Sequence, residues 1–179
     1  PNKLGLFGVS EDTPILLYAG RVSKEKGVLE ISTIYKQAKE KHPNIKLVVV
    51  GKGQALEQMK TENPDAIFID WVEHAQLPAI YSSADLLVLP SRFDTFSNVV
   101  LESLSCGLPV IAYNTKGPKD IIRNGQDGYL VNTAAEITEK IDEFLRSENK
   151  ITMKQSATQR GYSYNAQHII SDLMKSIGF

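Results

Sequence analysis

The sequence has a single cysteine and no long apolar run. The one cysteine, Cys106, excludes both an intrachain disulfide and a four-cysteine zinc site. Its isolation favours a reducing compartment, so we expect the protein to lie in the cytoplasm. No stretch approaches the roughly 20 consecutive apolar residues that a membrane-spanning helix needs.

An excess of charge of either sign is also missing. The 20 Lys and Arg residues are balanced by 21 Asp and Glu residues, which gives a net charge of −1 at pH 7. A dedicated nucleic-acid binder usually has a basic excess, so we expect no nucleic-acid partner. The 179 residues are 42% hydrophobic, which suffices for one ordinary domain and excludes disorder as the main state.

Motifs for two common kinds of enzyme chemistry are absent. No Gly-x-Ser-x-Gly nucleophile elbow occurs, so a serine hydrolase has no support. No Asp-x-Asp pair is present to hold a metal-bound diphosphate, and the three histidines are far apart with no second ligand at metal spacing. The residues therefore predict no metal site.

Six short apolar runs are present, each bounded by Gly, Pro or Asp. Near-continuous apolarity, rather than alternation, is typical of strands that are covered on both faces, as in a parallel sheet. The runs span residues 14–20, 45–51, 66–70, 85–90, 109–113 and, more weakly, 128–131.

Between the runs, apolar residues recur at spacings of three and four, as on one face of a helix. The alternation of strands and helices predicts an α/β fold, a doubly wound Rossmann-like parallel sheet of about six strands. Ligands bind such sheets at the carboxyl ends of the strands, so the turns after the strands should carry the chemistry. The expected helices cover residues 28–38, 77–84, 99–104, 137–145, about 150–160 and 166–177.

The turn after the first run carries two cations. Arg21 and Lys26 flank the entry to a helix, and Gly20 and Gly27 let the backbone approach a ligand closely. A helix N-terminus favours an anion, and charge-assisted hydrogen bonds add about 1.5–3 kcal/mol each. The turn is thus a candidate diphosphate clamp, although for this motif alone a solvated basic turn is slightly favoured.

The turns after the second and fifth runs carry weaker signals. Gly51 and Gly53 flank Lys52 in a flexible turn on which a ligand could lie, but Gly-x-Gly is also an ordinary tight connection. Lys116 and Lys119 could face the same cleft, but a solvated basic turn accounts for both.

The stretch after the fourth run is the most informative. Ser97 is a suitable N-cap for the following helix, Asp94 precedes it in the loop, and Glu102 lies more than one turn inside the helix. Because helical side chains lean toward the N-terminus, both carboxylates can face one cleft, beside the free N–H groups of Ser97, Asn98 and Val99. Carboxylates accept from hydroxyls and N–H groups donate to phosphate, so the ligand would be both a polyol and a phosphate. The alternative is a capped helix with Glu102 as a surface charge.

Several segments together match one family in order and spacing. They are residues 18–21 with 26–27, 50–53, 77–91, Asp94 with Glu102, 106–110, 125–128 and 162–165. This set resembles the C-terminal, donor-binding half of retaining glycosyltransferases of the GT-B fold, family 4 (glycosyl transferases group 1). The resemblance covers nearly the whole chain.

The resemblance implies roles for the two carboxylates. The family signature is two glutamates separated by seven residues, and Asp94 and Glu102 hold those places. By analogy, Glu102 would bind the ribose hydroxyls of a nucleotide sugar and Asp94 the transferred hexose. Two departures stand out: Asp94 is one methylene shorter than the usual glutamate, and Ser97 stands where glycine is common.

The resemblance also implies the rest of the donor site. Arg21 and Lys26 would hold the diphosphate and stabilise the leaving group, so Arg21, Lys26, Asp94 and Glu102 are the candidate catalytic residues. No metal and no cofactor are expected, because the family needs none. The candidate donor-binding residues are Gly20, Gly51, Gly53, Trp71 and Val72 (base side), Phe96 and Ser97 (sugar), and Asn98 and Val99 (phosphate).

By the same resemblance, residues 1–161 would form the donor-binding domain. Residues 162–179 would be a C-terminal helix that packs back on an N-terminal acceptor domain absent from this sequence. The isolated chain is expected to be inactive and to bind its donor weakly. The intact enzyme would transfer a hexose from a UDP- or GDP-sugar, with retention, to a glycan or glycolipid acceptor such as capsule or lipopolysaccharide.

The full enzyme could associate peripherally with the cytoplasmic face of the membrane. Two other functions stay open from the sequence. One is half of a sugar-nucleotide epimerase of the same fold, for which no acid/base pair is found. The other is a nucleotide-sugar binding module without activity.

Overall fold

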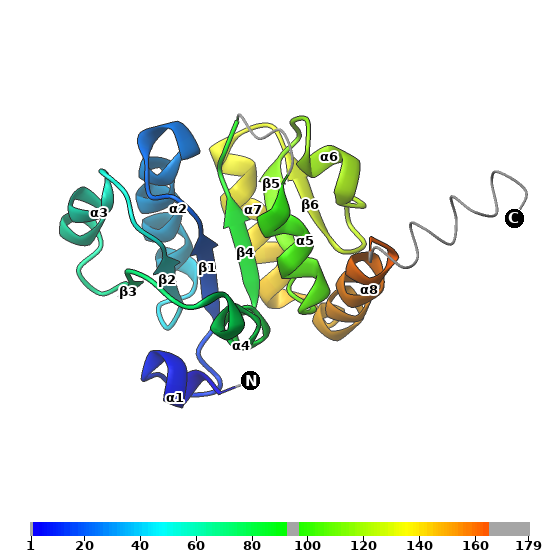
Figure 1. Cartoon of the computed structure of the whole chain (residues 1–179), viewed down its shortest axis with the longest axis horizontal. Helices are drawn as coiled ribbons and strands as arrows, with labels where there is room; N and C mark the ends of the chain where they lie inside the picture. The colour runs from blue at the N-terminus through cyan, green and yellow to red at the C-terminus, as the bar shows by residue number, and fades with distance from the viewer. Residues whose placement is uncertain (1, 93–96, 165–179) are drawn as a thin grey trace, which may run out of the picture.

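The computed structural model of the chain describes residues 2–92 and 97–164 (Figure 1). All six predicted strands are present and form one sheet in the order β3-β2-β1-β4-β5-β6, with every neighbouring pair parallel. The predicted doubly wound sheet is thereby confirmed. The strands are β1 Ile15–Ala19, β2 Lys46–Val50, β3 Ile67–Ile69, β4 Leu86–Leu89, β5 Val110–Tyr113 and β6 Gly128–Val131.

The helices occupy the connections between the strands. Each helix predicted within the described residues is present, and the helix predicted over residues 166–177 lies outside them. The helices are α1 Lys3–Phe7, α2 Val28–Lys41, α3 Leu56–Glu62, α4 Leu77–Ser83, α5 Asn98–Ser105, α6 Pro118–Ile121, α7 Ala134–Arg146 and α8 Lys150–Ser163, with short 3₁₀ helices at Lys24–Lys26 and His74–Gln76.

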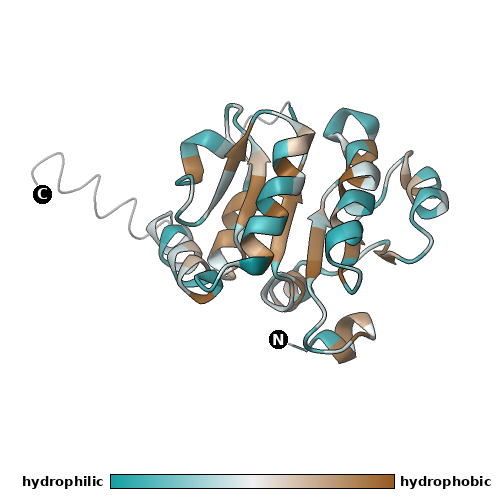
Figure 2. Cartoon of the chain, turned by 180° about the vertical axis from the view of Figure 1, so that it is seen from behind, coloured by the Kyte–Doolittle hydropathy of each residue, from teal (hydrophilic) through white to brown (hydrophobic). Residues whose placement is uncertain are grey.

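The sheet separates two apolar layers. Successive strand residues point to opposite faces, so Leu16 and Tyr18 pack with the apolar sides of α2 and α7, whereas Leu17 and Ala19 pack with α4, α5 and α8. Every residue of β1, β4 and β5 is buried, as expected for strands covered on both faces. Figure 2 shows the result from behind, with apolar strands inside and mostly hydrophilic outer helix faces.

The sheet order creates a crevice between β1 and β4. The two strands are neighbours, but the chain leaves β1 toward α2 on one face and leaves β4 toward α5 on the other. The connections diverge at the carboxyl ends of the strands, which lie at the top of Figure 1. Such a switch point is where α/β sheets bind their ligands.

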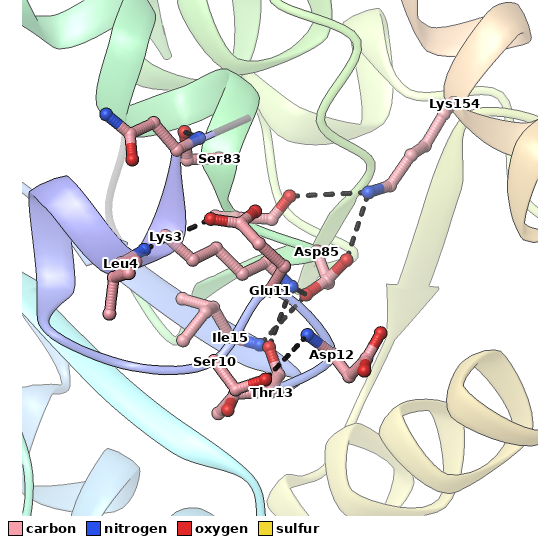
Figure 3. Close-up of polar contacts among 12 residues, drawn as sticks. Lys3, Leu4, Ser10, Glu11, Asp12, Thr13, Ile15, Ser83, Asp85 and Lys154 are labelled. Carbon is pink, nitrogen blue, oxygen red and sulfur yellow. Dashed lines mark hydrogen bonds and ion pairs between the residues drawn. The ribbon is translucent and has the colours of Figure 1, made fainter.

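A charged junction closes the opposite end of the sheet (Figure 3). Lys3 Nζ lies 2.7 Å from Asp85 Oδ2 and 2.7 Å from the Thr13 carbonyl oxygen, and Lys154 Nζ lies 3.0 Å from Asp85 Oδ1. Asp85 Oδ2 also accepts from the Ile15 N–H at 3.0 Å. Asp85 thus joins α1, the start of β1 and α8. Burial alone would raise the pKa of Asp85, but the charge of Lys154 and the hydrogen bond from Lys3 lower it below its ordinary value.

Candidate functional site

The turns after β1 and β2 are joined main chain to main chain. The Gly20 N–H donates to the Val50 carbonyl at 2.9 Å, and the Val22 N–H donates to the Lys52 carbonyl at 2.9 Å. The Tyr18 hydroxyl donates to the Arg21 carbonyl at 2.7 Å and holds the turn from within. These bonds fix the backbone from which Arg21 projects.

Glycines allow the close approach of these turns. A Cβ on Gly51 would lie 1.9 Å from the Gly20 carbonyl oxygen, and one on Gly53 would lie 2.0 Å from the Val22 carbonyl oxygen. Both distances are far below van der Waals contact. Gly51 and Gly53 therefore allow one backbone to pack closely on another. That a ligand also lies on this turn stays a prediction.

Gly27 joins the turn after β1 to the end of β4. Its φ of +71° is left-handed, and an added Cβ would lie 2.0 Å from the Pro90 carbonyl oxygen. The two turns that border the crevice are thus in direct contact through Gly27.

Two adjoining hollows open at this edge of the sheet, and both are lined by Ala19, Gly20, Arg21 and Val99. The larger, of about 280 Å³, extends toward β2 and β3, and the smaller, of about 170 Å³, lies between β1 and β4. The larger is also lined by Val50, Gly51, Lys52, Asp70, Trp71, Val72, Leu77, Tyr81 and Glu102, and the smaller by Tyr18, Lys26, Leu89, Ser97 and Asn98.

Most of the predicted site residues therefore meet at one place. Arg21 and Glu102, more than 80 positions apart, line the same hollow. Gly53 lines neither hollow. Asp94 and Phe96 lie outside the described residues, so their predicted contacts with the sugar stay predictions.

Glu102 is held by a buried tyrosine. The Tyr81 hydroxyl donates to Glu102 Oε2 at 3.0 Å, which supplies the polar partner that a carboxylate in an apolar helix needs. Burial, with the charge of Glu102, raises the pKa of Tyr81 above its ordinary value, so the hydroxyl stays a donor at neutral pH. The other carboxylate oxygen, Glu102 Oε1, lies 3.8 Å from Nε2 of the exposed His74.

Ser97 begins α5 as predicted, but its side chain does not cap the helix. Its φ and ψ, −82° and 76°, depart from the extended geometry that aims an N-cap oxygen at the helix N–H groups. The Ser97 Oγ is buried and has no hydrogen-bond partner among residues 2–92 and 97–164. A buried hydroxyl without a partner is costly, and this one borders the smaller hollow.

Three polar residues that line the larger hollow were not among the predicted site residues: Lys52, Asp70 and Tyr81. Tyr81 lies on an apolar helical stripe, which indicates a core residue, and the structure does bury it in the core. Asp70 comes directly after β3 and Lys52 two residues after β2, and that position was the only available signal.

The family model for glycosyl transferases group 1 matches residues 7–164. The chain belongs to this family. Many curated proteins are similar to the chain in sequence. The Salmonella typhimurium lipopolysaccharide 1,2-N-acetylglucosaminetransferase is 33% identical over 137 residues, which cover 69% of this chain and 36% of the relative. The Staphylococcus aureus capsular polysaccharide biosynthesis glycosyltransferase CapM is 29% identical, over 77% of this chain and 38% of the relative.

Solved glycosyltransferase structures share the fold. Sucrose-phosphate synthase from Thermosynechococcus elongatus superposes with a TM-score of 0.83 at 23% identity, over 98% of this chain and 47% of that chain. The C-terminal domain of the group 1 family protein LpcC from Francisella tularensis gives a TM-score of 0.76 at 21% identity, over 84% and 85%. The chain is thus a C-terminal GT-B glycosyltransferase domain, and it spans a little over a third of the length of the two curated relatives above.

The described residues hold no group of three or more His, Cys, Asp or Glu side chains able to bind a metal ion. They also contain no helix that is both long and apolar enough to cross a membrane. That the donor site works without a metal stays a prediction.

Proposed function

We propose that the two adjoining hollows bind the nucleoside diphosphate of a UDP- or GDP-sugar. The observation that carries the proposal is the convergence of Arg21 and Glu102 on one hollow at the switch point of the sheet. A cation and a carboxylate at that spot suit the two parts of such a ligand, the anionic diphosphate and the hydroxyl-bearing ribose.

The site residues divide between these parts. Arg21 and Lys26, with the first N–H groups of α5, would hold the diphosphate and stabilise its charge as it leaves. Glu102 would accept from the ribose hydroxyls through the oxygen that Tyr81 leaves open. The unpartnered Ser97 hydroxyl would gain its missing hydrogen bond from the ligand.

The proposal extends to the intact enzyme. We propose transfer of a hexose, with retention and without a metal, to a glycan or glycolipid acceptor held by a further domain. The names of the relatives support this class, since one is a lipopolysaccharide N-acetylglucosaminetransferase and the other a glycosyltransferase of capsular polysaccharide biosynthesis. The Anabaena protein Alr3699/HepE, solved with UDP and glucose (TM-score 0.80, 17% identity, 98% of this chain and 50% of that chain), supports the ligand. We propose that the enzyme lies in the cytoplasm, either free or attached to the cytoplasmic face of the membrane.

Substitution of the two converging residues tests the proposal. The test is calorimetric titration with UDP and GDP. Arg21→Ala and Glu102→Ala should each lower the affinity for the more tightly bound nucleotide by about tenfold or more, since a hydrogen bond to a charged group contributes about 1.5–3 kcal/mol. Lys116→Ala is the matched control, because Lys116 is exposed on another turn of the same sheet edge and lines neither hollow. Equal affinity in all four proteins, or no binding of either nucleotide, would contradict the proposal.

The Tyr81 hydroxyl should contribute to binding only through Glu102. Tyr81→Phe removes one buried hydrogen bond, so nucleotide affinity should fall about threefold to tenfold, the equivalent of about 1 kcal/mol. Tyr162→Phe, on the exposed side of α8, is the control and should bind as the unchanged chain does. If the double variant binds nucleotide as tightly as Glu102→Ala alone, Tyr81 acts by positioning Glu102. If the two losses of affinity add, that role is contradicted.

A further inference from the structure

The order of the strands sets the direction in which a bound nucleotide runs. The diphosphate residues follow β1 and β4, whereas Asp70 and Trp71 follow β3, the edge strand, two strands away from β1. Neighbouring strands are about 4.8 Å apart, so this end of the larger hollow lies roughly 10 Å from the switch point. If the proposed function holds, a ribose bound at Glu102 places its base at the β2–β3 end.

Trp71 offers a surface on which a base can stack. Trp71, the sole tryptophan of the chain, is 67% exposed and borders the larger hollow. A large exposed apolar ring at a pocket needs a reason, and stacking on a base is worth about tenfold or more in affinity. The area of an indole suits the two fused rings of a purine better than a single pyrimidine ring.

The Asp70 carboxylate keeps hydrogen-bond acceptors available at the same place. It lines the hollow and is 55% exposed, and its Oδ1 lies 3.7 Å from Lys60 Nζ, beyond hydrogen-bond length. Lys60 is closer to Glu57, at 3.1 Å. Lys52, which follows the neighbouring strand β2, also lines the hollow and brings a hydrogen-bond donor there.

We propose that Asp70 makes this site selective for guanine, so that the donor is a guanosine diphosphate sugar. Guanine presents two adjacent donors, N1–H and N2–H₂, which match the two oxygens of one carboxylate, and its O6 and N7 accept from a lysine. Uracil has one donor, N3–H, between two carbonyl oxygens that a carboxylate repels. Adenine sets the N1 acceptor beside its N6–H₂ donor, and cytosine sets N3 beside its N4–H₂, so each gives one bond and one repulsive contact.

Titration of the 179-residue chain with GDP, UDP, ADP and CDP tests the inference. GDP should bind at least about tenfold tighter than each of the other three, since a bidentate pair discriminates by about that factor or more. A preference for UDP, or equal affinities, would overturn the selectivity and leave the proposed function standing. No binding of any nucleotide would overturn both.

Substitution of Asp70 separates its carboxylate from the rest of the pocket. Asp70→Asn should lower GDP affinity about tenfold, because the amide nitrogen meets the guanine donors, while UDP affinity stays equal or rises. Glu57→Gln removes a carboxylate from the same Lys60 neighbourhood outside the hollow, and it should leave both affinities unchanged. An equal loss for GDP and UDP in Asp70→Asn would mean that the residue acts on the pocket as a whole, which would overturn the inference.

Discussion

Gly51→Ala should remove a large part of the folding free energy of this domain. The added methyl group would lie 1.9 Å from the Gly20 carbonyl oxygen, and the φ of +139° is itself unfavourable for alanine. The methyl carbon and the carbonyl oxygen are both fixed to the backbone, so neither can rotate away from the other. To relieve the clash, β1 and β2 would have to separate at their carboxyl ends. We expect a loss of about 4 kcal/mol or more, out of the 5–15 kcal/mol typical of a domain.

Gly125→Ala is the matched control for backbone conformation. Its φ of +78° is also left-handed, but an added Cβ would meet nothing within 4 Å. Urea unfolding followed by circular dichroism should therefore give a cost of only about 1–2 kcal/mol for this variant. Equal losses in the two variants would show that backbone strain, rather than the contact with Gly20, governs the effect.

Asp85→Asn should be the next most damaging change. It leaves the ammonium of Lys3, a residue that is 7% exposed, without its charged partner at the base of the sheet. Loss of one member of a buried ion pair costs about 3 kcal/mol or more. Glu57→Gln, which breaks an exposed pair with Lys60, should cost less than about 1 kcal/mol by the same urea measurement.

The same variant should alter the response of the domain to acid. Because the pKa of Asp85 is lower in the folded chain than its unfolded value of about 3.9, its stabilising contribution is present above that pH. It is lost as the pH falls through the folded pKa. The difference between the unchanged chain and Asp85→Asn should stay constant from pH 7 to about pH 5 and narrow below about pH 4. A difference that persisted undiminished at pH 3 would rule out this carboxylate as its source.

The sheet was predictable from the sequence because burial on both faces leaves a strong mark. The runs 45–51 and 85–90 hold unbroken apolar stretches at residues 47–50 and 86–89, and each run contains the strand that the structure shows. Helix α3 was missed because only Leu56 and Met59 are buried on it, and its N-cap position is Ala55, which has no capping side chain. Helix α1 has two buried residues and left no periodic pattern.

The site was predictable where the fold alone brings residues together. Arg21 and Glu102 follow neighbouring strands, so a parallel sheet places both at one edge. The function of the glycines was not predictable, because a sequence shows that Gly51 lacks a side chain without showing what would occupy its place. Nor was the orientation of Ser97, because an N-cap residue and a buried serine that caps nothing look alike in sequence.

The main-chain hydrogen bonds between the turns after β1 and β2 hold one wall of the larger hollow in a fixed shape. A ligand would meet walls that are already in place, so little chain entropy need be given up on binding. These hydrogen bonds join main chain to main chain, so replacing the side chain of Lys52, Asp70 or Trp71 would leave them intact. Single substitutions at these positions could then change which base is preferred while the backbone of the pocket stays the same.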